Sequence, residues 1–367
     1  MKKIKLSSIT LAIAAPFAAA LVSIVISSLA VLASHKSPFD AYKTMWDYGT
    51  TSGSLMQMLN TATPYYIAAV AIAITFRAGL FNIGVEGQLR LGAIFGAYLG
   101  AKFILPPVLH IIAIMIIAMT IGGLWAAIAG YLKVKRGVSE VISTIMLNSL
   151  AGGLSSYLLA NHFIDRTTNS NNMSTKALPA SGQFPDLMPL LNKFGIEDQP
   201  GGGVYGMLIF AIALGFVFWF VINRTRFGFE LRASGSNPIA ARFSGVNSKR
   251  MVFVAMALSG AVAGLAGLPA VLGETYAFNM GFRTGIGFSA IAVALLGRNN
   301  PVGMAISAML FGFLEVSSRS LELIDIAPET YVIMQGSILL SSVIAYEVVR
   351  RYKITLQSKE LAKAVAE

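Results

Sequence analysis

The sequence predicts an all-α, polytopic membrane protein with about ten transmembrane helices and both termini in the cytoplasm. Hydrophobic residues make up 55% of the 367-residue chain and charged residues only 12%, about half the charged share of a soluble domain. Several apolar runs reach the roughly 20 residues that a helix needs to cross a bilayer. One soluble core could not bury so many such runs, so the composition argues against a soluble globular protein.

Ten apolar segments separated by polar loops form the predicted transmembrane helices. They are Ile9–Ala33, Leu55–Phe76, Leu89–Leu105, Val108–Leu132, Val138–Ala160, Val204–Ile222, Met251–Leu272, Gly285–Gly297, Val302–Ser318 and Tyr331–Val349. The first follows three lysines and is longer than the apolar region of a signal peptide, so we expect it to be retained. The eighth is short, which suggests half of a broken helix. Residues 1–367 are expected to form a single transmembrane domain.

The positive charges predict the orientation in the membrane. The net charge is +11, and most of the 28 Lys and Arg residues fall in alternate loops, as expected for cytoplasmic loops. An even number of helices then places both termini in the cytoplasm. Two loops are long, an extracellular one at 161–203 and a cytoplasmic one at 223–250. A nucleic-acid partner is not expected, because the cations lie in short loops between apolar runs.

No catalytic machinery is visible in the sequence. Cysteine is absent, and His35, His110 and His162 lie far apart without metal-ligand spacing. No phosphate-binding loop and no nucleophile–base pair can be identified. The chain is therefore expected to be no enzyme and to carry no cofactor or metal of its own.

The cytoplasmic loop 223–250 contains a predicted short amphipathic helix. Asn237 can cap its free N–H groups, Pro238 suits the first helical position, and Gly245 ends the helix. Such a helix needs a surface that buries its apolar side. The surface could be membrane lipid or a groove on a partner protein, and the residues alone leave both possibilities open.

Two further stretches combine polar residues with helix-breaking glycines. The first, Phe76–Gly100, contains Asn82, Glu86 and Gln88 between two apolar runs. Polar backbone at membrane depth is tolerated where it lines a cavity or is buried in protein. We therefore interpret this stretch as a broken helix whose three polar side chains hydrogen-bond a polar solute. The alternative is an ordinary cytoplasmic turn in which Glu86 pairs with an arginine, Arg77 or Arg90.

The second stretch, Gly281–Gly303, has the same character and contains Phe288 and Ser289. Transporters often carry two interrupted helices in corresponding halves that are related as inverted repeats. The two stretches are candidates for such a pair, with Phe288 and Ser289 meeting the solute near the middle of the membrane. Plain helix packing by small residues is the alternative.

Three segments resemble a known family. The loop sequence LRASGSNPIAARFSGVNSKR, which runs into MALSGAVAGLAG, resembles the coupling-helix loop of ABC importer permeases of the branched-chain amino acid, ribose and nucleoside type. The stretches FRAGLFNIGVEGQLRLGAIFGAYLG and GFSAIAVALLGRNNPVG resemble the early and late signatures of the sugar and nucleoside permeases in that group. The three motifs occur in the family's order and cover most of the chain.

The resemblance implies that the loop helix sits in a cleft of a cytosolic ABC ATPase, which binds ATP and Mg. The residues implied in this contact are Asn237, Pro238, Ala240, Ala241 and Gly245. It further implies import of nucleosides across a bacterial cytoplasmic membrane, with ribose or another simple sugar as the alternative. The implied partners are a second permease subunit, a paralogue in a heterodimer, and an extracellular substrate-binding lipoprotein. The loop lacks the acidic start of the Glu-Ala-Ala motif found in other importers.

Two other classes of protein were weighed. An ion-coupled secondary transporter would need no ATPase, and Glu86, Glu140 or Glu315 would carry its protons. A membrane enzyme acting on lipids would need a polar catalytic cluster near one interface, and the sequence shows none.

Overall fold

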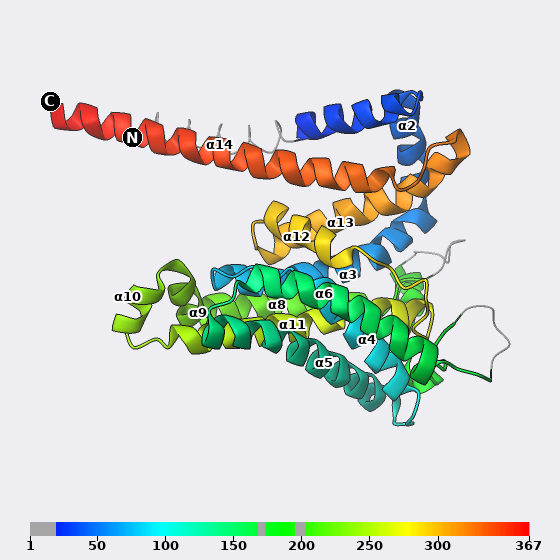
Figure 1. The fold of residues 1–367 in the computed structure, drawn as a ribbon. Helices are drawn as coiled ribbons and strands as arrows, with labels where there is room; N and C mark the ends of the chain where they lie inside the picture. The colour runs from blue at the N-terminus through cyan, green and yellow to red at the C-terminus, as the bar shows by residue number, and fades with distance from the viewer. Residues whose placement is uncertain (1–19, 168–172, 195–202, 367) are drawn as a thin grey trace. The chain divides into compact units, whose positions relative to one another are not determined.

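The computed structural model describes residues 20–167, 173–194 and 203–366 (Figure 1). Within these ranges the chain is helical, with isolated β-bridges but no regular strand. It divides into two compact units, one formed by Met1–Thr51 with Leu314–Glu367 and the other by Ser52–Phe313. The all-helical class predicted from the sequence is confirmed, and each unit is described below by itself.

The larger unit, Ser52–Phe313, contains most of the long helices. They are α3 (Ser52–Arg77), α4 (Val85–Gly100), α5 (Pro107–Arg136), α6 (Glu140–Leu158), α8 (Met207–Arg224), α9 (Arg226–Ser236), α10 (Pro238–Phe243), α11 (Ser248–Leu265), α12 (Ile286–Leu296) and α13 (Pro301–Ser318), whose last residues belong to the other unit. Shorter pieces are the π-turns Leu159–Phe163 and Ala270–Glu274, the 3-10 turns Ala180–Gly182 and Asn192–Phe194, and α7 (Met188–Leu191).

The central helix of this unit is α3, which is buried along nearly its whole length from Thr61 onward. Around it, helices pack closely through small residues, as in other membrane bundles. The crossing of α5 and α11 is an example, because a Cβ atom added to Gly122 would lie 2.3 Å from the carbonyl oxygen of Gly260. The close backbone approach at this crossing therefore depends on the two glycines.

Six of the described helices are long and apolar enough to cross a membrane, and a bent pair, Ala20–Ala33 with α2 (Pro38–Gly49), would make a seventh. Two predicted spans are shorter in the structure. Helix α4 has 16 residues and α12 has 11. The last predicted span, Tyr331–Val349, lies within α14 (Thr330–Ala366). The chain is thus polytopic as predicted, while ten complete spans remain a prediction. The short α12 agrees with the expected half-helix.

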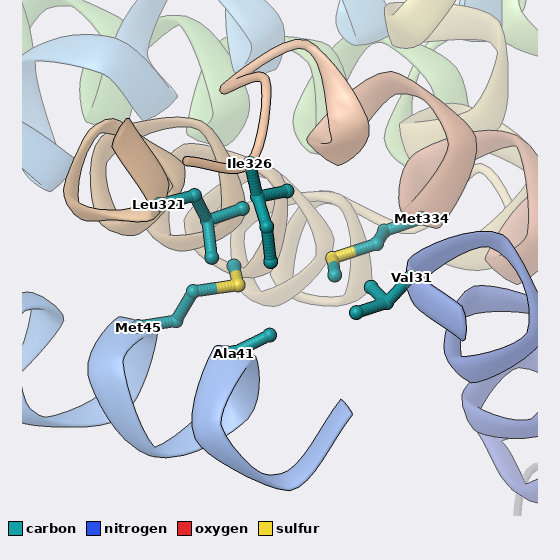
Figure 2. Packing of buried hydrophobic residues seen from close by; sticks show 6 residues of the cluster. All are labelled: Val31, Ala41, Met45, Leu321, Ile326 and Met334. Carbon is teal, nitrogen blue, oxygen red and sulfur yellow. The ribbon is translucent and has the colours of Figure 1, made fainter. Parts of the chain in front are cut away.

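The smaller unit combines the ends of the chain. It contains Ala20–Ala33, α2, the 3-10 turn Arg319–Ile324 and α14 (Thr330–Ala366). Figure 2 shows its core of Val31, Ala41, Met45, Leu321, Ile326 and Met334. Sequence analysis treated Pro38–Gly49 as loop, whereas the structure places an amphipathic helix there, bent by 109° from Ala20–Ala33. Part of the first predicted span, residues 9–19, lies outside the described residues.

The predicted extracellular loop 161–203 is tied to the helices by two polar side chains, as far as it is described. Buried His110 of α5 bonds Ser181 Oγ at 2.8 Å and the carbonyl oxygen of Gly100 at 2.9 Å. The amide of Asn60 in α3 donates to the carbonyl oxygen of Gly203 at 2.8 Å and accepts from the backbone N–H of Tyr205 at 3.0 Å. These bonds hold the loop against the ends of α3, α4 and α5.

Candidate functional site

After α3, the chain folds back into the helix layer before α4 begins. Gly79 adopts a left-handed φ of +69°, which favours glycine at this turn. Asn82 then lies beside α11 and donates to Ser259 Oγ at 2.9 Å, and that hydroxyl donates to the carbonyl oxygen of Ala71 in α3 at 2.6 Å. Because Ala71 lies well before the end of α3 at Arg77, α4 starts inside the bundle. The predicted break in this stretch is therefore confirmed.

Asn82 and Gln88 hold this break together. Their side-chain amides form a reciprocal pair, with N···O distances of 2.9 and 3.0 Å, and Asn82 Oδ1 also accepts from the N–H of Gly84 at 3.0 Å. Both side chains are fully buried. Their contact with a solute remains a prediction, because in this conformation both amides bond to the protein itself.

Asn148 of α6 also hydrogen-bonds the backbone at the break. Its Oδ1 accepts from the N–H of Gly87 at 2.8 Å, and its Nδ2 donates to the carbonyl oxygen of Ile83 at 2.7 Å. Sequence analysis did not connect Asn148 or Ser259 with the break. The only available signal was a single polar residue on an apolar segment, which does not identify its partner.

Glu86 connects the two interrupted stretches. Its two carboxylate oxygens accept from the backbone N–H groups of Gly285 at 2.8 Å and Gly287 at 2.7 Å, at the N-terminus of α12. Gly285 has a left-handed φ of +88°, and a Cβ added to Gly287 would lie 2.5 Å from the backbone nitrogen of Glu86. The N-terminal ends of α4 and α12 therefore meet, and we call this contact the half-helix junction.

The predicted alternative, in which Glu86 pairs with an arginine, is not what the structure shows. Among the described residues Glu86 forms no ion pair with Arg77 or Arg90. Arg77 donates to the carbonyl oxygen of Asn299 at 3.0 Å, and Arg90 Nε donates to Ser155 Oγ at 2.8 Å. The helix end of α12 takes the place of the arginine, because its free N–H groups are good partners for a carboxylate.

The other two predicted solute contacts lie on α12 directly after the junction. Phe288 is 53% exposed, while Ser289 is half-buried and bonds through its backbone N–H to the carbonyl oxygen of Gly285 at 3.0 Å. Glu86 itself keeps some exposed surface. The junction therefore reaches the surface of the larger unit, and Phe288 follows directly after Gly287, whose N–H bonds Glu86. That these residues line a solute path stays a prediction.

A large apolar groove lies elsewhere in the same unit. It has a volume of about 730 Å³ and is lined by α3, α8 and α13, including Tyr66, Phe216 and Met309. Its walls are almost entirely apolar, so it suits hydrocarbon better than a polar solute. The half-helix junction, with its charged and polar groups, is the better candidate for the solute path.

The predicted cytoplasmic loop forms two short helices at one end of the larger unit, α9 and α10 (Figure 1). As predicted, α10 begins at Pro238, and Asn237 Oδ1 accepts from the N–H groups of Ile239 and Ala240 at 3.0 Å. Gly245 turns the chain after it with a left-handed φ of +80°. The preceding helix α9 was not predicted. Thr225 caps it by accepting from the N–H of Gly228 at 3.2 Å.

The two faces of α10 differ in their surroundings. Ala241 is only 4% exposed and packs with Val246 and Met251. Ala240 is exposed, and the large apolar side chains of Ile239 and Phe243 are 71% and 90% exposed. The structure therefore separates two residues that sequence analysis treated alike, since Ala241 anchors the helix and Ala240 lies on its free face.

Long apolar helices, a pair of half-helices that meet inside the bundle and an exposed apolar helix beyond its end define a helical membrane transport protein. The family model for the permease component of the branched-chain amino acid transport system matches residues 54–343. The chain belongs to this family of permease components, and its resemblance to ABC importer permeases is confirmed.

Three relatives of this chain are permeases of ABC transporters for nucleosides or a sugar. The chain is 35% identical to the guanosine ABC transporter permease protein NupP of Bacillus subtilis, over 83% of this chain and 85% of the relative. It is 32% identical to the glucose ABC transporter permease protein TsgB13 of Haloferax volcanii, over 94% of this chain and 90% of the relative. It is 30% identical to the nucleoside ABC transporter permease protein NupB of Lactococcus lactis, over 88% of each chain.

Proposed function

We propose that the chain is the membrane-spanning permease subunit of an ABC importer that carries nucleosides into a bacterial cell. The observation that carries the proposal is the free apolar face of α10, with Phe243 90% exposed. An exposed apolar helix next to cationic side chains is typical of a docking element. Its partner is a cytosolic ATPase that binds ATP and Mg, so this chain catalyses no reaction and holds no cofactor.

The contacts of α10 give it a way to transmit movement. Ser248 at the start of α11 donates to the carbonyl oxygen of Pro238 at 3.1 Å, and Ala241 packs against Met251 of α11. A displacement of α10 by the ATPase therefore reaches α11, which carries Ser259 at the broken helix. In the proposed mechanism this movement makes the bundle alternate between outward and inward access to the half-helix junction.

The assignment as an ABC importer permease also leads us to propose a topology and two further partners. Ten spans, counting α4 and α12 as half-helices, would form one permease domain in the bacterial cytoplasmic membrane with both termini in the cytoplasm. The second permease would be a paralogue. Support comes from the further relatives NupQ of Bacillus subtilis, 30% identical, and NupC of Lactococcus lactis, 27% identical, because each of these organisms has two such permeases. An extracellular lipoprotein would deliver the solute.

The proposal is tested by uptake into proteoliposomes that hold the whole importer and are loaded with ATP. We expect them to accumulate labelled guanosine, and we expect empty or ADP-loaded vesicles not to do so. Accumulation driven by a proton gradient without ATP would instead support an ion-coupled transporter. Glucose is the second candidate solute, because the glucose permease relative covers 94% of this chain. Competition by unlabelled glucose would favour it.

A further inference from the structure

The half-helix junction concentrates positive electrostatic potential. Each helix N-terminus carries a partial positive charge from its free N–H groups, and here the N-termini of α4 and α12 meet. Transporters with discontinuous helices use such ends to bind the anionic group of a solute. In this chain the position is already occupied, because Glu86 accepts one backbone N–H of α12 with each of its two carboxylate oxygens.

Two cationic side chains among the described residues lie close to the junction along the chain. Arg90, on the next turn of α4, bonds Ser155 and lies 6.0 Å from the ring centroid of Phe278. Arg283, just before α12, lies 4.0 Å from Glu274. Glu86 is therefore the carboxylate that balances the two helix ends and Arg90. Without it, the junction would present a positive surface beside the exposed ring of Phe288.

We propose that Glu86 determines specificity by restricting the path to solutes without a negative charge. This inference deepens the proposed function and rests on it. A carboxylate or phosphate on the solute would meet Glu86 where the helix ends would otherwise attract it, and such like-charge contacts are a common means of rejecting a wrong ligand. Phe288 offers an apolar face to the ring of a base or a sugar. Uncharged nucleosides fit this site, whereas nucleotides and solutes with a free carboxylate do not.

The test compares two pairs of solutes that differ by one negative charge. The pairs are guanosine with its 5′-carboxylate analogue, and glucose with glucuronate. Binding is measured by titration calorimetry on the purified complex of both permeases and the ATPase in nanodiscs. The binding lipoprotein is left out, so that its own selectivity does not affect the measured affinities. The key variant is Glu86→Gln, which keeps the size of the side chain and removes its charge.

A matched control removes a carboxylate elsewhere. Asp325→Asn neutralises an exposed side chain of the smaller unit, at a left-handed backbone position that asparagine tolerates. Thermal unfolding of each complex shows whether the variant is still assembled. Because Glu86→Gln can weaken the cap of α12, only the ratio of the affinities for the two members of a pair is interpreted.

In the native complex we expect the anionic solute of a pair to bind at least about tenfold more weakly than the neutral one, since like-charge contacts cost several kcal/mol. Glu86→Gln should raise the relative affinity for the anion about tenfold or more, and Asp325→Asn should leave the ratio unchanged. A ratio that Glu86→Gln does not change would overturn the inference and leave ABC import standing. If none of the four solutes bound the native complex, the solute assignment and this inference would both fail.

Discussion

Side chains cap several helix N-termini in this protein, and the caps of α10 and α12 are built differently. In the loop 223–250, Asn237 caps α10 from the position directly before it. At the half-helix junction, Glu86 caps α12 from a helix about 200 residues earlier in the chain. The first cap is local and leaves its helix exposed to a partner. The second joins two segments that are distant in the sequence. The first cap therefore stabilises the helix that is proposed to dock, whereas the second holds two parts of the bundle together.

The largest effect is expected on the free face of α10. Replacing Ala240 with Arg puts a bulky charge where the ATPase is proposed to bind, so guanosine uptake should fall at least about tenfold, as for truncations at interface hot spots. The unfolding temperature of the isolated permease should stay unchanged because Ala240 is exposed. Uptake into proteoliposomes measures the first effect, and thermal unfolding of the isolated permease measures the second.

A control variant on the opposite face sharpens this result. Ala241→Arg forces a charge into the small core with Val246 and Met251, so it should lower the unfolding temperature as well as uptake. If Ala240→Arg and Ala241→Arg had the same effect on unfolding, the proposed difference between the two faces would be wrong.

The next effect concerns the buried amide pair. Asn82→Ala leaves the amide of Gln88 and the N–H of Gly84 without their partner, and each unsatisfied buried polar group costs about 1–3 kcal/mol. We expect a lower unfolding temperature and the loss of transport. The double variant Asn82→Leu with Gln88→Leu removes both polar groups and should recover part of the stability. Recovery of transport by the double variant as well would mean that neither amide is needed by the solute.

The smallest effect is expected at the local cap. Asn237→Ala removes the acceptor for two N–H groups and should destabilise α10 by about 1 kcal/mol. Asn237→Asp keeps an acceptor and should behave like the native chain. Proteolysis of the loop in the isolated permease measures the difference. Equal cleavage of the alanine and aspartate variants would contradict a capping role for this side chain.

The same contrast explains how far the sequence alone could lead. The helix α10 follows from neighbouring residues, because Asn237, Pro238 and Gly245 act on the backbone next to them. The two interrupted stretches were also visible as clusters of glycine and polar residues. The sequence does not show which group each polar side chain bonds. Glu86 was assigned to a solute or to an arginine, because nothing local shows that the end of α12 lies beside it.

The sequence also does not reveal which residues of α10 are buried, for a related reason. Ala240 and Ala241 are neighbours of the same type, and only the packing of α10 against Val246 and Met251 distinguishes them. The helices α2 and α9 were missed because their amphipathic sequences lie in stretches that were treated as loops. Counting apolar residues detects long spans well and indicated that α12 is short, but it does not show that α4 begins inside the bundle.

The central claim is that α10 docks on a separate ATPase, and the absence of cysteine from the chain allows a direct measurement. Phe243→Cys, at a position that is 90% exposed, would be labelled with a reagent that bonds the new thiol at one end and, on illumination, any neighbouring protein group at the other. Ile104→Cys, 80% exposed at the opposite end of the larger unit beyond α4, provides the control. We predict a covalent adduct with the ATPase from position 243 and none from position 104. Equal yields from the two positions would contradict the proposed coupling.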